Sequence, residues 1–298
     1  MKTISTEQKV WTILEIISAS TEYLKSKGID DARLNAELLL AHVLGCRRID
    51  LYAGFDKPLK DGERAHYKTL LKRRVAREPL QYIIGETEFM GLRFFVDRRV
   101  LVPRPDTEVL VERTIDLCRQ YQEETERITV LDIGTGSGNI AVAVARFVGN
   151  AYVTGIDISA EALEVAMRNV EAHKLSERVA LKKIDVMSDS IHSLGEPFDV
   201  LVSNPPYISK KEFAFLPPQI RDYEPRFAAC DESDGLTFFQ RISEIGKQLL
   251  RKDGHLFFEV GFGQCDEVQE IMGKSGFTEL ESFKDLGGIE RVVNGKLG

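Results

Sequence analysis

The chain has 298 residues, of which 43% are hydrophobic and 29% are charged, so it is long enough for two domains with apolar cores. No apolar stretch reaches the roughly 20 residues that a membrane helix needs, and the first residues lack an apolar secretory segment. These features argue against a membrane or secreted protein, and we expect a cytoplasmic one.

Charge is shared unevenly along the chain. The net charge is −7, yet residues 1–85 hold 15 basic and 11 acidic residues, whereas the remainder holds 25 basic and 36 acidic ones. So acidic a remainder is a poor match for a phosphate backbone, and we expect no direct nucleic-acid partner. The four cysteines and five histidines show no metal-ligand spacing, which predicts free thiols and no metal site.

The N-terminal region is predicted to be a small bundle of helices. Apolar residues recur at helical spacing within residues 10–17, 34–43 and 61–77. Asp30 or Asp31 is expected to cap the second helix, and Gly45 is expected to end it. Because residues 1–80 contain no chemical motif, we expect a substrate-recognition domain. Its basic cluster is either a solvated helix face or a docking surface, and it consists of Lys72, Arg73, Arg74 and Arg77.

Two short segments after this bundle predict a β-hairpin. Residues 82–84 and 92–96 have strand-like composition and are separated by a stretch that contains glycine. We therefore divide the chain into a helical domain over residues 1–80, a hairpin linker over 81–99 and a catalytic domain over 100–298.

A glycine-rich turn follows the first buried strand pattern of the catalytic domain. Residues 127–132 form an apolar run typical of a parallel strand, and a helical pattern begins near Ile140. Glycines at such a turn allow close approach of a ligand to the backbone. The absence of a Gly-x-x-x-x-Gly-Lys-Ser/Thr sequence argues against a nucleotide triphosphatase. The candidate cofactor-binding residues in this turn are Gly134, Thr135, Gly136, Ser137 and Gly138.

Acidic residues stand at the ends of the next two strand patterns. The second strand ends at Asp157, where a carboxylate can accept hydrogen bonds from both ribose hydroxyls of an adenosine. The third ends at Asp185, next to Val186, in a position to reach the adenine base. Two structural alternatives stay open. Asp157 can cap the helix that begins near Ser159, and Asp185 can be an ordinary loop carboxylate.

The tetrapeptide Asn204-Pro205-Pro206-Tyr207 follows a strand pattern over residues 198–203. The nitrogen of an amide or aromatic amine is a poor nucleophile because its lone pair is delocalised, but two acceptors that hold its N–H bonds can aim that lone pair. The Asn204 side-chain oxygen and the Pro205 carbonyl are such acceptors, the prolines make the loop rigid, and Tyr207 supplies a flat face. A simple proline turn is the alternative. The position at a strand's C-terminal end favours catalysis by Asn204, Pro205 and Tyr207 and substrate binding by all four residues. Asn204 is also a candidate for cofactor binding.

The order of these motifs resembles that of S-adenosylmethionine-dependent methyltransferases, and nearly the whole chain resembles the HemK/PrmC release-factor glutamine methyltransferase family. The Arg-Pro-x-Thr-Glu segment that begins at Arg104, the Tyr-Glu-Pro sequence at Glu224 and the Asp-Gly-Leu sequence at Gly235 also resemble that family. The chain departs from the family pattern at residues 228–233 and directly after Asp185.

This resemblance implies an α/β fold: a Rossmann-like class I S-adenosylmethionine-dependent methyltransferase domain with a seven-stranded sheet, preceded by a helical bundle. It implies transfer of a methyl group from S-adenosyl-L-methionine, which becomes S-adenosyl-L-homocysteine, to the side-chain amide nitrogen of the Gly-Gly-Gln glutamine in peptide chain release factors. Arg104, Thr107 and Glu108 are then candidates to close over the methionine end of the cofactor, and a structural junction is their alternative.

Three other functions are weighed against this one. A glutamine methyltransferase acting on a ribosomal protein shares the nucleophile, and an adenine-amine DNA methyltransferase would use the same tetrapeptide chemistry. The DNA enzyme would need a basic cleft and a base-flipping region, of which the sequence offers little. A non-catalytic binding module is disfavoured by the intact Asn204 motif.

Overall fold

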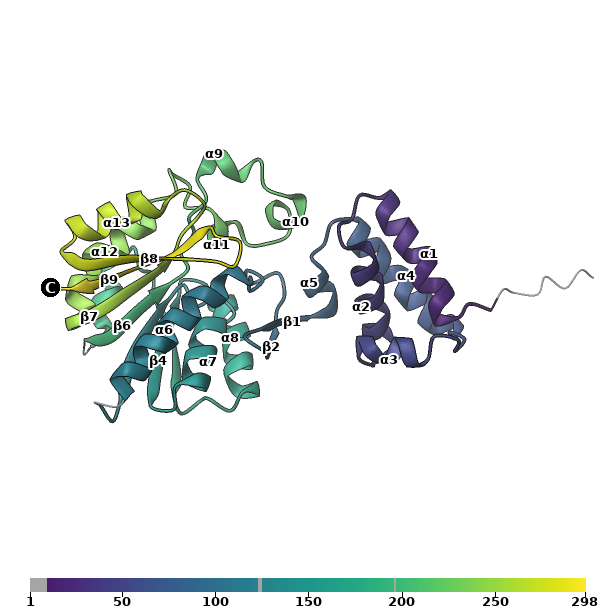
Figure 1. Cartoon of the computed structure of the whole chain (residues 1–298), viewed down its shortest axis with the longest axis horizontal. Coiled ribbons are helices and arrows are strands. Elements are labelled where there is room, and N and C mark those ends of the chain that lie inside the picture. The colour runs from purple at the N-terminus through teal and green to yellow at the C-terminus, as the bar shows by residue number, and fades with distance from the viewer. Residues whose placement is uncertain (1–9, 123–124, 196) are drawn as a thin grey trace, which may run out of the picture. The chain divides into compact units, whose positions relative to one another are not determined.

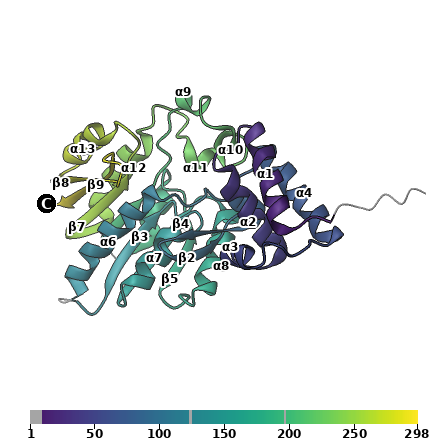
Figure 2. The same ribbon diagram turned by 45° about the vertical axis from the view of Figure 1, so that its right-hand side comes forward.

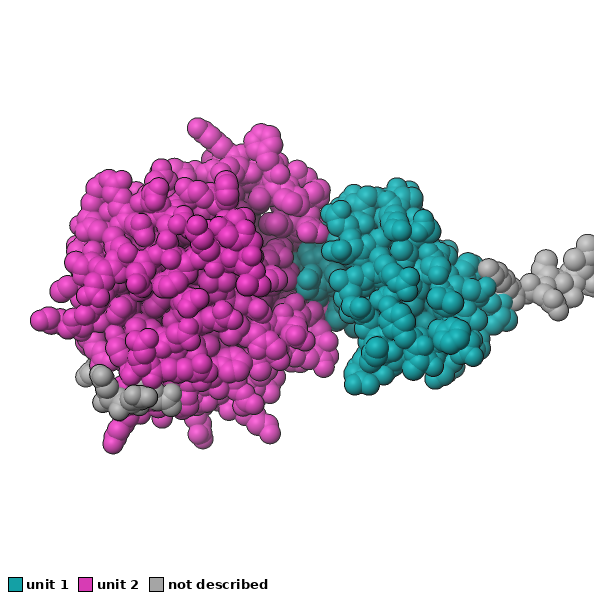
Figure 3. Space-filling model, in the orientation of Figure 1, with its two compact units in different colours: residues 1–84 teal, residues 85–298 magenta. Residues whose placement is uncertain are grey.

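The computed structural model describes residues 10–122, 125–195 and 197–298. They form two compact units, one that ends at Ile84 and one that begins at Gly85 (Figure 3). Each unit has an apolar core of its own. No helix in the described ranges combines the length and the apolar character that crossing a membrane requires.

The first unit is helical, as the apolar spacing predicts. Its helices are α1 (Ile13–Ser26), α2 (Ala32–Leu44), α3 (Arg48–Ala53), α4 (Asp61–Val75) and α5 (Leu80–Ile84). Gly45 ends α2 in a left-handed conformation with φ 61°, which confirms that prediction. Asp31 occupies the N-cap position of α2, as predicted, but it has φ 46° and its side chain makes no capping hydrogen bond. Instead, the Asn35 side-chain amide donates to the carbonyls of Asp30 and Asp31.

The arginines of the predicted basic cluster stabilise their own unit. Arg73 donates two hydrogen bonds of 2.8 Å to the Glu78 carboxylate. Arg74 is only 7% exposed and donates to Asn35 Oδ1 at 2.7 Å, so it does not belong to a solvated face. Arg77 donates to the Gly28 carbonyl at 2.6 Å. These contacts give the cluster a structural role, and a docking role stays a prediction.

The predicted hairpin exists, but its first strand lies later than expected. Residues 82–84 belong to helix α5, whose Ile83 packs in the helical core. The strands are β1 (Glu86–Phe89) and β2 (Leu92–Phe95), paired antiparallel. Met90 and Gly91 form the connection with φ values of 53° and 69°, as a two-residue hairpin turn requires. The Met90 N–H donates to Glu108 Oε1 at 2.6 Å, and this long-range contact could not be recognised from local pattern.

A seven-stranded sheet forms the centre of the described part of the second unit (Figure 1). Its strand order is β5-β4-β3-β6-β7-β9-β8, in which β9 alone runs antiparallel to its neighbours. The strands are β3 (Ile128–Ile133), β4 (Ala151–Asp157), β5 (Val179–Lys183), β6 (Phe198–Ser203), β7 (Leu250–Glu259), β8 (Phe277–Lys284) and β9 (Glu290–Leu297). After β3 the chain proceeds outward to β5 and then returns to place β6 on the other side of β3. Parallel sheets bind ligands at such a switch point, beyond the C-terminal ends of the strands.

Helices cover both faces of this sheet, as Figures 1 and 2 show. Val130 and Val202 pack on one face of the sheet, whereas Leu131 and Leu201 pack on the opposite face. This alternation is the period of a strand buried on both sides. The first face carries α6 (Asp106–Gln122), α7 (Asn139–Phe147) and α8 (Ala160–Ala172), and the second carries α12 (Thr237–Leu249) and α13 (Cys265–Lys274). Between β5 and β6 lies the 3-10 helix η1 (Asp189–Leu194), and between β6 and α12 lie α9 (Lys210–Phe213), α10 (Pro218–Arg221) and α11 (Arg226–Ala229).

A buried asparagine attaches the hairpin to the rest of the second unit. Asn169 of α8 is fully buried, accepts a hydrogen bond from the Phe95 N–H at 2.7 Å and donates to the Phe95 carbonyl at 3.0 Å. Its Nδ2 also donates to the Ser137 carbonyl at 2.8 Å, in the glycine-rich turn. One side chain therefore joins the hairpin, α8 and that turn.

Replacing Asn169 with Ala should lower the free energy of unfolding by about 3 kcal/mol, because it leaves buried backbone groups of Phe95 and Ser137 without partners. Urea unfolding followed by circular dichroism measures this loss. The exposed α8 residue Glu171 supplies the matched control, since Glu171→Ala should change stability by less than about 0.5 kcal/mol. Equal effects of the two substitutions would contradict the anchoring role.

Candidate active site

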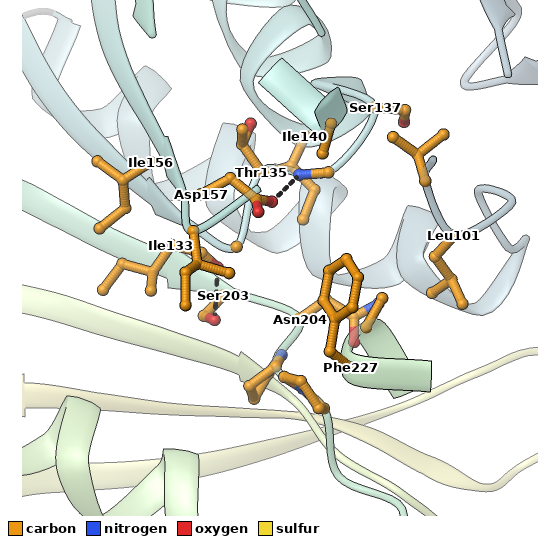
Figure 4. A pocket seen from close by; sticks show the side chains of 18 of the residues that line it. Leu101, Ile133, Thr135, Ser137, Ile140, Ile156, Asp157, Ser203, Asn204 and Phe227 are labelled. Atoms are coloured by element: carbon orange, nitrogen blue, oxygen red, sulfur yellow. Dashed lines mark hydrogen bonds between the residues drawn. The ribbon is translucent and has the colours of Figure 1, made fainter. Parts of the chain in front are cut away.

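A pocket opens at the C-terminal ends of β3, β4 and β6, within the second unit (Figure 4). It contains most of the residues that the sequence identifies as candidates. Its lining residues lie within residues 99–107, 133–140, 156–162, 184–187, 203–206 and 227–242. Three candidates do not line it: Glu108, Gly138 and Tyr207.

The glycine-rich turn leaves room for a ligand. Gly134 and Gly136 have φ values of 76° and 53°, in the left-handed region that favours glycine. A Cβ atom at Gly134 would meet no atom within 4 Å, and one at Gly136 would meet only a backbone oxygen at 3.9 Å. Gly138 has a different role, because a Cβ there would lie 3.2 Å from the Ala166 side chain. This third glycine therefore permits close packing against α8.

Asp157 holds the glycine-rich turn against the end of β4. Its Oδ2 accepts from the Gly136 N–H at 2.9 Å (Figure 4), and its Oδ1 accepts from the Ser159 N–H at 2.9 Å. Burial raises the pKa of this carboxyl, and the donated N–H bonds oppose that rise. The N-cap of α8 is Ser159, whose hydroxyl accepts from the Ala162 N–H, so capping does not explain why Asp157 lines the pocket.

The second acidic strand-end candidate, Asp185, lines the part of the pocket that follows β5. Asp185 Oδ1 accepts from the Met187 N–H at 2.8 Å, which shapes the turn around the buried Val186. Asp185, Val186 and Met187 all line the pocket. The turn therefore presents a carboxylate, backbone groups and apolar surface together.

The Asn204 side chain has a defined orientation. Its Nδ2 donates to the Thr107 hydroxyl at 3.2 Å, which leaves the amide oxygen Oδ1 available as an acceptor. The preceding Ser203 is fully buried and donates to the Ile133 carbonyl at 2.8 Å, which ties the end of β6 to the end of β3. Figure 4 shows Asn204 on the side of the pocket that lies across from Thr135 and Asp157.

Tyr207 lies behind the loop instead of facing the pocket. Its ring packs against the core that α12 and α13 cover, and its hydroxyl donates to Glu259 Oε1 at 3.3 Å. Burial and the neighbouring Glu259 carboxylate both raise the pKa of the Tyr207 hydroxyl. An aromatic side chain that does line the pocket is Phe227 of α11, which lies beside Asn204 in Figure 4 and is 52% exposed.

The residues of the Arg-Pro-x-Thr-Glu segment have two different roles. Arg104 and Thr107 line the pocket, whereas Glu108 accepts the Met90 N–H and supports the hairpin. Arg104 also forms an ion pair with the buried Glu224, whose other oxygen accepts from the Val102 N–H at 3.2 Å. Burial raises the pKa of Glu224, and Arg104 opposes that rise.

Sequence reasoning missed three groups that the fold brings to this region. Phe227 comes from α11, and Phe238 lines the pocket from α12. Glu259 ends β7 beneath the tetrapeptide and is 2% exposed. The position of an acidic residue at the end of a strand, near the ligand-binding edge of the sheet, is a signal that could have identified Glu259. No local pattern identifies the two phenylalanines.

Comparison with known proteins agrees with this geometry. The PrmC N-terminal domain model matches residues 15–85, and the methyltransferase small domain model matches residues 112–216. The crystal structure of the hMettl16 catalytic domain in complex with the MAT2A 3'UTR hairpin 1 has a TM-score of 0.57 at 18% identity, covering 94% of this chain and 91% of that one. Fold and family models together define a Rossmann-like class I S-adenosylmethionine-dependent methyltransferase.

Similarity to curated proteins narrows the class. A release factor glutamine methyltransferase of Chlorobaculum tepidum is 41% identical, over 97% of this chain and 98% of its own. One of Geobacter sulfurreducens is 42% identical, over 97% and 98%. The chain belongs to the release factor glutamine methyltransferase family.

Proposed function

We propose that this protein transfers a methyl group from S-adenosyl-L-methionine to the side-chain amide nitrogen of the Gly-Gly-Gln glutamine of peptide chain release factors. The observation that carries this proposal is the orientation of Asn204, whose Nδ2 is held by Thr107 while Oδ1 stays available in the pocket. Family membership over nearly the full chain supports the choice of substrate. We place the reaction in the cytoplasm, where release factors act.

The residues of the pocket fit this cofactor. The open space at Gly134 and Gly136 admits a ligand against the backbone. Asp157 Oδ2 accepts the Gly136 N–H and Oδ1 accepts the Ser159 N–H, and the carboxylate has further lone pairs for ribose hydroxyls. Asp185 and Val186 would contact the adenine, and Thr135 and Ser137 would contact the remainder of the cofactor. Gly138 contributes by letting α7 begin close to α8.

Asn204 and Pro205 would hold the target amide by its two N–H bonds. The bound cofactor supplies an electrophilic methyl group on a positively charged sulfur. As the amide nitrogen attacks, positive charge develops on it, so the fixed dipoles of Asn204 Oδ1 and the Pro205 carbonyl stabilise the transition state. Orienting this nitrogen toward the methyl group would lower the barrier further. The methylated nitrogen is acidic and can lose its proton to water after transfer, so the reaction requires no general base.

A methyl-transfer assay tests the proposed function. The purified protein and labelled S-adenosylmethionine are incubated with release factor, with ribosomal protein or with duplex DNA. Label should enter release factor alone, and mass spectrometry should place it on the Gly-Gly-Gln glutamine. Preferential labelling of ribosomal protein or DNA would overturn the proposal and support the corresponding alternative.

Replacing Asn204 with Ala should lower kcat by about 10²–10³-fold, because one of two preorganised acceptors for the amide is lost. Steady-state kinetics on release factor measures kcat, and calorimetry with S-adenosylhomocysteine measures cofactor affinity, which should change far less. A rate similar to the wild type would contradict the role of Asn204.

Asp157→Ala is the matched control with the opposite profile. It should weaken S-adenosylhomocysteine by about 1.5–3 kcal/mol, because hydrogen bonds to a charged group are lost. At saturating cofactor its kcat should fall much less than that of Asn204→Ala. Unchanged affinity would restrict Asp157 to holding Gly136 and Ser159.

We propose that the first unit recognises the folded release factor, while the Asn204 loop holds only the glutamine. A truncated chain should begin at Gly85, because the hairpin is bonded to α8 through Asn169. It should bind S-adenosylhomocysteine normally and methylate intact release factor with a raised KM, since remote binding energy is lost. A short Gly-Gly-Gln peptide should be a weak substrate for both chains, so its kinetics are the control. Equal losses on protein and peptide would indicate a structural role for the first unit.

A further inference from the structure

A buried carboxyl group lies directly behind the Asn204 loop. Glu259 ends β7, is 2% exposed and accepts a hydrogen bond from the Tyr207 hydroxyl at 3.3 Å. The Thr107 hydroxyl lies near enough to this carboxyl group to lower its pKa, while Glu259 Oε2 is buried and has no hydrogen-bond partner of ordinary geometry. Thr107 in turn accepts from Asn204 Nδ2 at 3.2 Å. Glu259, Thr107 and the Asn204 amide are therefore neighbouring polar groups, and Thr107 is hydrogen-bonded to Asn204.

The direction of these hydrogen bonds depends on the charge of Glu259. A hydroxyl has one proton to donate and two lone pairs to accept with. An ionised Glu259 accepts only, so Thr107 must point its proton at Glu259 and accept from Asn204. A neutral Glu259 can itself donate to Thr107, which frees the Thr107 proton to point at Asn204. The Asn204 amide could then turn over and present its NH₂ group to the pocket.

We propose that ionised Glu259 is a positioning residue that, through Thr107, keeps the Asn204 oxygen directed at the substrate amide. The catalytic consequence rests on the proposed function, because only an N–H-bearing substrate requires an acceptor at this position. If Asn204 turned over, its NH₂ group would face the N–H groups of the substrate amide. The hydrogen bond that holds the target nitrogen would then be lost. Glu259 itself need not touch substrate.

The surroundings of Glu259 make its charge sensitive to pH near neutrality. Burial raises the pKa of Glu259 to about 7, and the Asp106 carboxylate on α6 adds to the rise. The Thr107 and Tyr207 hydroxyls lower this pKa, as does the Arg291 guanidinium on β9. Arg291 is itself paired with Asp106 at 2.9 Å, so its influence is shared. The positioning form of Glu259 therefore accumulates as pH rises through about 7, and kcat should rise with it.

Three substitutions separate positioning from simple structural support. Glu259→Gln places a permanent donor beside Thr107 and should lower kcat by about 10²-fold while flattening its rise with pH. Thr107→Val keeps the shape but removes the hydroxyl, and it should lower kcat to a similar extent. Thr107→Ser restores the hydroxyl and should recover most of that loss. Calorimetry should find S-adenosylhomocysteine binding close to that of the wild type in Glu259→Gln, because Glu259 does not line the pocket.

A buried acid outside the pocket gives the matched control. Asp199 near the start of β6 is 2% exposed and accepts from the Thr129 hydroxyl at 2.8 Å. Asp199→Asn removes a buried charge as Glu259→Gln does, yet it should leave kcat and its pH profile unchanged. If Glu259→Gln does not fold, the contrast between Thr107→Val and Thr107→Ser still decides the proposal.

The orientation of Asn204 can also be read without turnover. Selective ¹⁵N labelling of asparagine side chains should show contacts between the Asn204 NH₂ protons and Thr107 at a pH about one unit above the Glu259 pKa. These contacts should weaken about one unit below it and be absent in Glu259→Gln. An unchanged amide signal, or wild-type kcat with an unaltered pH profile in Glu259→Gln, would overturn the positioning role. If the wild type shows the amide signal but methylates no release factor, the proposed substrate fails and the positioning role stands.

Discussion

The parallel pairing of β3 with β6 is the constraint on which the rest of the site depends. The two strands are distant in sequence but adjacent in the sheet, and Ser203 bonds to the Ile133 carbonyl where both end. This pairing brings the glycine-rich turn and the Asn204 loop to opposite sides of one pocket. The side chains that line this pocket belong to loops and helices next to the C-terminal edge of the sheet.

Buried carboxyl groups fix how the chain segments around the pocket are arranged. Glu259, Glu224 and Asp157 are each at most 9% exposed, and each is held by donors from segments distant in sequence. Burying a carboxyl is costly unless such donors are present, so these contacts require their segments to meet in one arrangement. The same contacts leave the facing oxygen of Asn204 free for another partner.

The hairpin shows where local sequence reasoning failed and why. Residues 82–84 have strand-like composition, yet they are helical because Ile83 packs into the core of the first unit. The true strands are held by Asn169 and Glu108, which lie 74 and 18 residues from the groups that they bind. Tertiary contacts of this kind override weak local propensity.

The sequence by itself determined the motifs whose parts are close together: the helical bundle, the glycine-rich turn, the acidic strand ends and the tetrapeptide at Asn204. Each depends on local backbone conformation and strand periodicity, which a short run of residues encodes. Only the tertiary structure decided that Tyr207 lies behind the loop, that Phe227 faces the pocket, and that Thr107 lies near both Asn204 and Glu259. Those side chains come from the Asn204 loop, α11, α6 and the end of β7, and no local pattern specifies which of them will meet once the sheet forms.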